Sequence, residues 1–408
     1  MSLGQGVARQ EPGAATLDRR LLALMTVACG VTVANLYYPQ PLLPTISRAF
    51  RVPEGTAGLL VTAMQVSYLL AMLFILPLGD LADRRKLVFR LLLLGALGLA
   101  ASAASPGFAA LAALLAVVAV ACVVAPLLLP FGSTLAADDE RGRVVGTILG
   151  GILTGILLAR TFAGLVAGAV GWRGPFAIAA VAMLVLAIAL RRALPRVAPA
   201  TSVPYAELLL SVAALVRREP LLRRRMAIGA CSFASFSLVW TTLGFLLAAP
   251  PFHLSQTAIG LFGLVGAAGA ACAQTIGRVA DRGRGRAATG AALAGLLASW
   301  GVLAVGRSSL VLIGAGLLLL DFGMQVQNVL NQSAVYALAR EHASRLATAY
   351  LVSNFAGGAV GSAAGALAWS LGRWDAVCAA GAVFALLGLV AWATDRTDRT
   401  DRTDRVVA

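Results

Sequence analysis

Charged side chains are scarce in this sequence. Lys, Arg, Asp and Glu make up 12% of its 408 residues, whereas 59% of the residues are hydrophobic. Soluble proteins carry about twice that charged fraction. A water-exposed surface of this size needs more charge to stay dispersed, so the apolar excess must face lipid. The composition therefore excludes a water-soluble globular protein and favours transmembrane helices.

Histidine and cysteine are also rare. The two histidines, His253 and His342, fall in predicted loops on opposite sides of the membrane, and the five cysteines stand singly inside apolar stretches. This spacing is not that of a metal site or a disulfide framework. A membrane enzyme needs a nucleophile, a metal or an acid/base cluster near one interface, and the sequence offers none there. We expect no enzymatic activity, no metal and no cofactor.

The intervals without charged residues measure the membrane spans. A helix that crosses the ~30 Å hydrocarbon core needs about 20 residues, because each residue rises ~1.5 Å. Two intervals are double length and are broken by turn sequences at Ser105-Pro106-Gly107 and Pro250-Pro251. The predicted spans lie in the intervals 21–47, 55–79, 91–137 (two spans), 144–172, 174–190, 226–277 (two spans), 287–306, 309–335, 346–372 and 376–394. The sequence predicts an all-α polytopic membrane protein with twelve transmembrane helices in two pseudo-symmetric six-helix bundles.

A stretch rich in Pro and Arg separates the two sets of six spans, and residues 205–218 within it could form a short amphipathic helix at the membrane surface. The predicted parts are an N-terminal tail (1–20), an N-terminal bundle (21–194), a linker (195–222), a C-terminal bundle (223–394) and a tail of Thr-Asp-Arg repeats (395–408).

The net charge of +15 is explained by membrane orientation. With a cytoplasmic N-terminus, 27 of the 33 Lys and Arg residues lie on the inner side, as the positive-inside rule requires. Five lie outside, and Arg160 lies within a span. We therefore expect both termini in the cytoplasm and no nucleic-acid partner.

The two halves contain a repeated loop. Gly79-Asp80-Leu81-Ala82-Asp83-Arg84 follows span two, and Gly277-Arg278-Val279-Ala280-Asp281-Arg282 follows span eight. Such duplication is typical of transporters built from two six-helix units. The chain resembles the major facilitator superfamily over about residues 20–394, because that family carries a GxxxDRxGR-like loop at both positions. Lys86 stands where the family pattern has its second Gly.

Three further stretches resemble a bacterial branch of this family that includes drug:proton antiporters and exporters of sugars or purine nucleosides. They are Asn35 to Pro41, Leu158 to Thr161 and Asp321 to Gly323. This resemblance implies proton-coupled efflux across the bacterial inner membrane, with a small-molecule substrate and the lipid bilayer as partners. We expect the chain to act as a monomer.

The resemblance also implies that the two loops form a conformational latch. Asp83 would cap the N-terminus of span eleven, near Arg345, when the cytoplasmic side is closed. The alternative is that these charges only shape a turn and set the topology. The predicted latch residues are Gly79, Asp83, Arg84, Gly277, Asp281 and Arg282.

Span ten carries a polar stripe. Asp321, Gln325, Asn328 and Gln332 recur at helical spacing, so one face of this span cannot face lipid. We predict that Asp321, Gln325 and Asn328 line the substrate cavity and that Asp321 loads and releases the coupling proton. Asp321 could instead be a structural carboxyl, hydrogen-bonded to a helix end or to Asn328.

Arg160 lies at or beyond the middle of span five and must have a partner there. It could bind an anionic group of the substrate, pair with Asp321 in one conformational state, or act as a structural strut. Near the outer part of span one, Asn35, Tyr38 and Gln40 alternate with prolines, which predicts a bent helix with polar tips facing a passage. Tyr38 could equally be an interface anchor.

Weaker candidates for the cavity wall stand in spans two, seven and eleven: Gln65, Tyr68, Ser235, Trp240, Tyr350 and Asn354. The sequence favours a secondary transporter that works by alternating access, with proton-coupled efflux of a drug-, sugar- or nucleoside-like solute. An uptake symporter or a transporter-like sensor of the same fold is the alternative.

Overall fold

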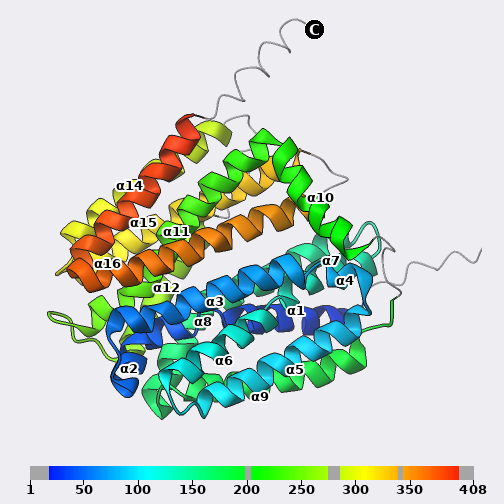
Figure 1. The fold of residues 1–408 in the computed structure, drawn as a ribbon, viewed down its shortest axis with the longest axis horizontal. Helices are drawn as coiled ribbons and strands as arrows, with labels where there is room; N and C mark the ends of the chain where they lie inside the picture. The colour runs from blue at the N-terminus through cyan, green and yellow to red at the C-terminus, as the bar shows by residue number, and fades with distance from the viewer. Residues whose placement is uncertain (1–17, 198–203, 274–284, 339–342, 395–408) are drawn as a thin grey trace, which may run out of the picture.

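The computed structural model describes residues 18–197, 204–273, 285–338 and 343–394. The regular secondary structure of these residues is helical. The helices, shown in Figure 1, are α1 (Arg19–Ala34), α2 (Pro39–Phe50), α3 (Glu54–Phe74), α4 (Leu78–Leu81), α5 (Arg84–Ala103), α6 (Phe108–Ala121), α7 (Val124–Leu135), α8 (Arg141–Val170), α9 (Gly174–Ala193), α10 (Tyr205–Arg218), α11 (Pro220–Ala248), α12 (Gln256–Ala273), α14 (Gly285–Val305), α15 (Leu310–Tyr336) and α16 (Ala343–Ala393).

The described helices account for twelve membrane spans. Ten helical stretches are long and apolar enough to cross a bilayer, and α12 is a shorter apolar helix between two of them. The last stretch contains two spans, because Gly372 and Arg373 within α16 have non-helical backbone angles. This confirms the predicted all-α fold with twelve spans.

Three spans consist of two helices joined end to end, and prolines mark the joints. Pro39 begins α2 directly after α1, and Pro77 precedes α4 directly after α3. In the fourth span, α7 follows α6 and has Pro126 in its first turn and Pro130 in its interior. Proline has no backbone N–H to donate within a helix, so each of these spans bends where the prolines stand. The bend predicted in span one is present.

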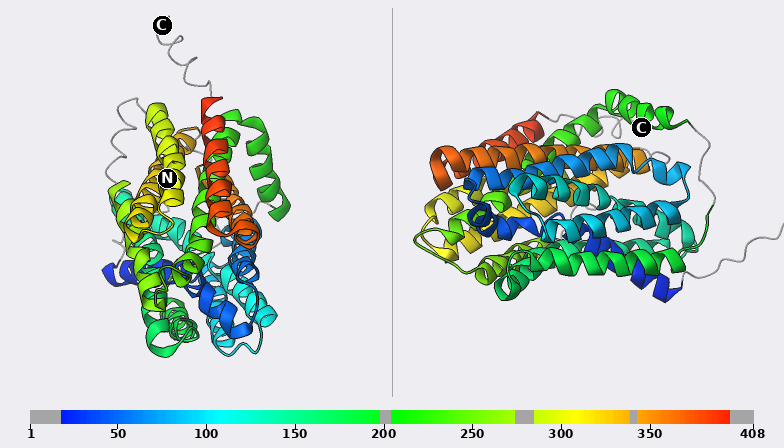
Figure 2. Two further views of the ribbon diagram at one scale, coloured as in Figure 1. Left: turned by 90° about the vertical axis from the view of Figure 1, so that its left-hand side faces the viewer. Right: turned by 60° about the horizontal axis from the view of Figure 1, so that its bottom comes forward.

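The spans form two bundles of six. Within the N-terminal bundle α1 packs on α8 and α5 on α9, and within the C-terminal bundle α11 packs on α16 and α14 on α15. The bundles meet where α3 contacts α16 and α8 contacts α12. Figure 2 shows the helices of both bundles running roughly parallel. Helix α10 connects the bundles and covers residues 205–218, as the sequence predicts.

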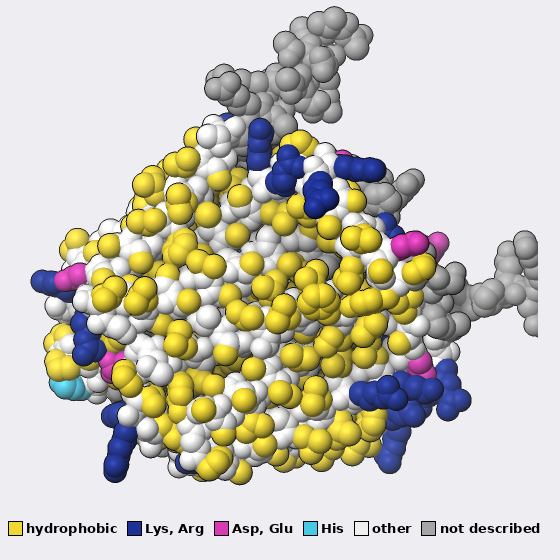
Figure 3. Space-filling model, in the orientation of Figure 1, with side chains coloured by type: hydrophobic (Ala, Val, Ile, Leu, Met, Phe, Trp, Pro, Cys, Tyr) yellow, Lys and Arg dark blue, Asp and Glu magenta, His cyan; other side chains and the backbone are white. Residues whose placement is uncertain are grey.

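The outer surface of the bundles is apolar. Leu97, Val181 and Val311 are each more than 60% exposed, and Figure 3 shows hydrophobic side chains across the visible face with charged side chains gathered at its edges. Apolar patches of this extent are not stable in water. This surface fits the hydrocarbon core of a membrane.

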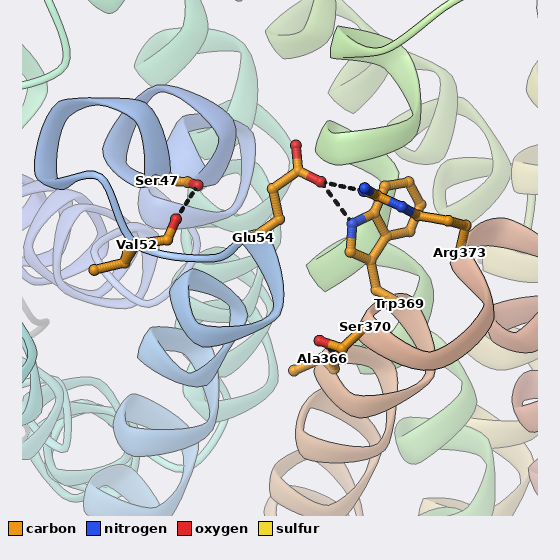
Figure 4. Close-up of polar contacts among 7 residues, drawn as sticks. All are labelled: Ser47, Val52, Glu54, Ala366, Trp369, Ser370 and Arg373. Carbon is orange, nitrogen blue, oxygen red and sulfur yellow. Dashed lines mark hydrogen bonds and ion pairs between the residues drawn. The ribbon is translucent and has the colours of Figure 1, made fainter.

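The two bundles are joined at the end where α3 begins, which we call the Glu54 end. Glu54 Oε2 lies 2.6 Å from a guanidinium nitrogen of Arg373 and accepts a hydrogen bond from Trp369 Nε1 at 2.8 Å (Figure 4). Nearby, the Gln256 side chain bonds the Thr45 hydroxyl and the Pro41 carbonyl. Because each of these contacts joins one bundle to the other, they hold the Glu54 end closed.

The opposite end, where α5 begins, is called the Asp83 end. The described hydrogen bonds and ion pairs of Asp83 and Arg84 are all made within their own bundle. In addition, Gly142, Gly146 and Gly150 of α8 have no heavy atom within reach of an added Cβ. The first half of α8 is therefore less tightly covered than its second half, which contacts α12.

Candidate functional site

Arg160 is buried near the middle of the molecule, on α8. It is 4% exposed, and its Nε donates a hydrogen bond to Gln40 Oε1 at 2.7 Å. Its guanidinium lies over the ring of Trp240 from α11, 3.8 Å from the ring centroid, and within 6 Å of the Tyr37 and Phe236 rings. Aromatic faces stabilise a cation that has left water. Arg160 thus connects the N-terminal bundle to a helix of the C-terminal bundle.

Asp321 on α15 is also 4% exposed and contacts the same indole at its N–H. Its Oδ1 accepts a hydrogen bond from Trp240 Nε1 at 3.2 Å. Arg160 and Asp321 form no ion pair with each other, and Trp240 contacts both of them. The three side chains form a chain of contacts, which we call the charged triad, between α8, α11 and α15.

Glycines of α12 make room for the triad. A Cβ added at Gly266 would collide with the Asp321 carboxylate and the Trp240 ring, and one added at Gly263 would press on the Cβ of Arg160. At Gly260, α12 touches the backbone of α8 at Gly164. Small residues permit such close helix crossings in membranes. Helix α12 therefore packs directly against the triad.

Two hydrogen-bond donors beside the triad have no partner among the described residues. They are Arg160 Nη2 and Gln40 Nε2, and both atoms are buried. Gln40 itself is 2% exposed. An unsatisfied buried donor costs roughly 1–3 kcal/mol, and more when it is charged. These two atoms mark a place where a polar ligand would be stabilised.

The other residues predicted near the bend of span one have local roles in this conformation. Asn35 Nδ2 donates to the carbonyls of Val31 and Thr32 in its own helix. The Tyr38 ring lies 5.3 Å from that of Phe162 on α8. Both side chains are buried. Of the three predicted residues in this segment, only Gln40 has a side-chain hydrogen bond to the triad.

Gln325 and Asn328 stand one and two turns beyond Asp321 on α15, and both are half-buried. Asn328 Oδ1 accepts hydrogen bonds from Gln332 Nε2 and from the Tyr350 hydroxyl, each at 3.1 Å. The polar face predicted for span ten is therefore satisfied partly within α15 and partly by α16. It leads from the triad toward the Asp83 end.

The predicted latch residues are only partly covered by the structure. Asp83 accepts hydrogen bonds from the backbone of Arg85 and Lys86, so it caps its own helix α5. Gly79 lies against the Leu127 side chain, where an added Cβ would collide. Arg84 bonds the Gly79 carbonyl and Asp80. The remaining three, Gly277, Asp281 and Arg282, lie outside the described residues.

Two features of the site have weak signals in the sequence. Trp240 is the centre of the triad, yet an aromatic residue in an apolar helix is unremarkable; its spacing of i, i+3, i+7 with Phe233 and Phe236 is the available hint. The contact of Glu54 with Arg373 and Trp369 joins residues more than 300 positions apart. Loop charges at span ends are normally assigned to topology alone.

Among the described residues, no three His, Cys, Asp or Glu side chains stand close enough together to hold a metal ion. The arrangement offers instead a buried cation, a buried carboxylate and aromatic faces between two bundles. Ionisable groups are costly within a membrane unless they are paired or serve a function.

Comparisons with known proteins agree with this description. The family model described as Major Facilitator Superfamily matches residues 22–362. The putative uncharacterized transporter YgaY of Escherichia coli K12 is 44% identical over 376 residues, which cover 92% of this chain and 95% of that protein. The probable transporter SCO4007 of Streptomyces coelicolor is 34% identical over 394 residues, covering 95% of this chain and 91% of that protein.

A solved structure shares the fold at low sequence identity. A bacterial homolog of the human lysosomal transporter Spinster, in an inward-facing and unoccupied conformation, matches with a TM-score of 0.71 and 15% identity. The match covers 92% of this chain and 94% of that one.

Proposed function

This chain belongs to the major facilitator superfamily and is a membrane transporter, and from that premise we propose that it exports a small solute across the bacterial inner membrane in exchange for protons. The charged triad carries this proposal. It is buried where helices of both bundles meet, and ionisable groups are costly within a membrane unless they serve transport or are paired.

Alternating access is the proposed mechanism. The described contacts close the Glu54 end, while the bonds of Asp83 and Arg84 that the structure describes all lie within their own bundle. By the positive-inside rule, the Asp83 end is the cytoplasmic one, because the clusters of Lys and Arg flank the spans there. Both termini then lie in the cytoplasm. The described arrangement is thus proposed to be the inward-facing state, from which solute is taken up on the cytoplasmic side.

Asp321 is proposed as the proton carrier. Its carboxylate accepts a hydrogen bond from the Trp240 N–H, and the guanidinium of Arg160 lies over the ring of the same indole. A proton on Asp321 removes one of the two charges of the triad and leaves the charge of Arg160 uncompensated. Because the two charges sit on different bundles, this change alters the attraction between the bundles, which is the step a coupled transporter requires.

Uptake by symport is the second candidate. The observation that favours it is that Arg160 has no ion pair with a carboxylate among the described residues. A proton on Asp321 and an acidic solute near Arg160 would then balance each other's charge and travel together. Cells that lack the protein would fail to acquire the solute if it works by uptake, and would accumulate the solute if it works by efflux.

The test of the proposal is transport in proteoliposomes with an imposed pH gradient. Sugars, nucleosides and lipophilic cations are screened with the parent protein, and the transported solute is then used with Asp321→Asn. We expect the parent to show flux that depends on the pH gradient. Asp321→Asn keeps the size and the hydrogen-bond acceptor but cannot ionise, so it should retain solute exchange and lose the dependence on the gradient.

Glu54→Asp is the control, because it alters another carboxylate, one that joins the two bundles, but keeps its charge. It should retain the dependence on the pH gradient. If Asp321→Asn couples flux to protons as the parent does, Asp321 is not the proton carrier.

A further inference from the structure

Arg160 forms no direct ion pair among the described residues, and the carboxylate nearest to it in this site, that of Asp321, is joined to it through Trp240. The described contacts of Arg160 are the Gln40 amide oxygen and the faces of Tyr37, Phe236 and Trp240. Aromatic faces and an amide oxygen reduce the cost of burying a guanidinium, but they do not neutralise it. A site with this composition has affinity for a negative charge.

The donors at this site point to the shape of the anion. The Nε and Nη2 atoms of an arginine form a fork that matches the two oxygens of a carboxylate. In this structure Gln40 Oε1 takes the Nε position, while Nη2 has no acceptor among the described residues. The oxygen of the Gln40 side-chain amide is bonded to Arg160, and its nitrogen, Nε2, is a second donor with no partner among the described residues. The site therefore offers two buried N–H donors beside one positive charge.

The surroundings indicate what the rest of the ligand is. A continuous series of rings begins at Trp240, and neighbouring centroids lie 4.5–6.3 Å apart. The series consists of Trp240, Phe236, Phe233, Phe355 and Tyr68. It crosses from one bundle to the other, because Tyr68 belongs to α3 and Phe355 to α16. Rings of this kind bind an apolar body and offer few donors to a second charge.

We propose that the transported solute is an organic monocarboxylate. Its carboxylate accepts hydrogen bonds from Arg160 Nη2 and Gln40 Nε2, and its apolar body lies against the aromatic series. A phosphate with two charges fits less well, because the site supplies one cation and already contains the carboxylate of Asp321. This assignment rests on the proposed transport function, but not on the direction of transport.

The test measures binding of benzoate, 4-phenylbutyrate and hexanoate, each against its neutral amide, to the full-length protein in lipid nanodiscs by calorimetry. The parent is expected to bind at least one of these acids more than about tenfold tighter than the matching amide, because a desolvated charge-assisted pair is worth a few kcal/mol. The assignment is overturned if every acid binds no better than its amide.

Gln40→Glu is the decisive variant. It places a carboxylate from within the protein against Arg160, where the carboxylate of the solute is proposed to bind, so the variant should fold as well as the parent. We expect it to lose the preference for the acid over the amide by about tenfold or more. Arg307→Gln removes an arginine whose ion pair with Asp375 is solvent-exposed, and it should keep the preference. A preference retained in Gln40→Glu contradicts the assignment.

Counterflow in proteoliposomes separates this inference from the proposed function. If neutral solutes are transported while the acids neither bind nor move, the protein is a transporter and the carboxylate assignment alone is wrong. If neither the acids nor the sugars, nucleosides and cations move, the proposed transport function fails with it.

Discussion

A single indole, that of Trp240, lies between the two membrane-embedded charges of the triad. Its face supports the guanidinium of Arg160, and its N–H bonds the carboxylate of Asp321. In the proposed mechanism, the indole contacts both the group that binds the ligand and the group that carries the proton. We regard it as the side chain that links these two groups.

Trp240→Phe separates these contacts, because phenylalanine keeps a ring beneath Arg160 but has no N–H. A hydrogen bond to a charged group is worth about 1.5–3 kcal/mol. We expect a loss of melting temperature in detergent and a loss of flux under a pH gradient of roughly tenfold.

Trp300→Phe is the matched control. Trp300 is buried at 1% exposure and donates its N–H to the neutral hydroxyl of Ser235 at 2.7 Å. This variant should lose melting temperature but keep its flux relative to the amount of folded protein. Equal losses of flux in the two variants would mean that Trp240 serves packing alone.

The predictability of these residues differs for a physical reason. Arg160 and Asp321 are visible in the sequence because each interrupts an interval otherwise free of charge, where a charge must have a use. Gln40 can be identified from the sequence as a candidate for the site because it stands among prolines at a predicted bend. Trp240 is only a weak candidate from the sequence, because an aromatic residue is equally suitable for a lipid-facing surface, a packed core and a binding site. Its role depends on what two other helices place beside it.

At the scale of elements, the break in α16 allows Arg373 to reach Glu54. Arg373 adopts a left-handed backbone conformation with φ 52°, which is unfavourable for a residue with a Cβ. The break separates the last two spans and places Arg373 against Glu54 at the start of α3. The charges Arg373 and Asp375 are enough to predict the break from the sequence. The partner of Arg373 is not predictable, because it lies 319 residues away on the other bundle.

Glu54→Gln tests whether this contact holds the Glu54 end closed. The variant keeps an acceptor for Trp369 but loses the attraction to Arg373. Exposed ion pairs are worth about 0.2–1 kcal/mol, so the open population at this end should rise by about 1.4- to fivefold. Distances between spin labels at Arg51 and Ser308, which lie on different bundles, measure that population.

Asp375→Asn is the control, because it breaks an exposed ion pair with Arg307 inside the C-terminal bundle. Both variants carry their labels at Arg51 and Ser308, so that Arg307 stays in place. It should leave the distances unchanged. A similar shift in both variants would show that surface charge in general, and not the Glu54 contact, controls this end.

At the scale of the whole molecule, the two bundles also touch between the closed end and the aromatic series. The hydroxyls of Thr62 on α3 and Ser362 on α16 lie 2.9 Å apart. The rings of Tyr68 and Phe355 meet one to two turns further along the same pair of helices. Alternating access requires the contact of Thr62 with Ser362 to open in the outward-facing state.

A double variant Thr62→Cys with Ser362→Cys tests this requirement. Oxidation should join the cysteines and stop transport, and reduction should restore it, because a covalent bond there prevents separation of α3 from α16. The two single variants should transport with or without oxidant. Transport that continues after complete cross-linking would contradict the rocking of the bundles.

The number of spans follows from the sequence, because a bilayer of fixed thickness demands about 20 apolar residues for each helix. The repeated loops likewise indicate two bundles. The end at which the bundles meet is not predictable from composition, since the same sequence must be stable in both arrangements. The contacts of Gln256 with Thr45 and Pro41 illustrate this, because they belong to only one of those arrangements.

The exposure of Arg373 has one more consequence. Its side chain is 72% accessible and that of Glu54 is 34% accessible, so dissolved ions reach both partners and weaken their attraction over a Debye length of about 8 Å at physiological salt. Added salt is therefore expected to weaken the contact between Glu54 and Arg373, whereas the buried triad is shielded from dissolved ions.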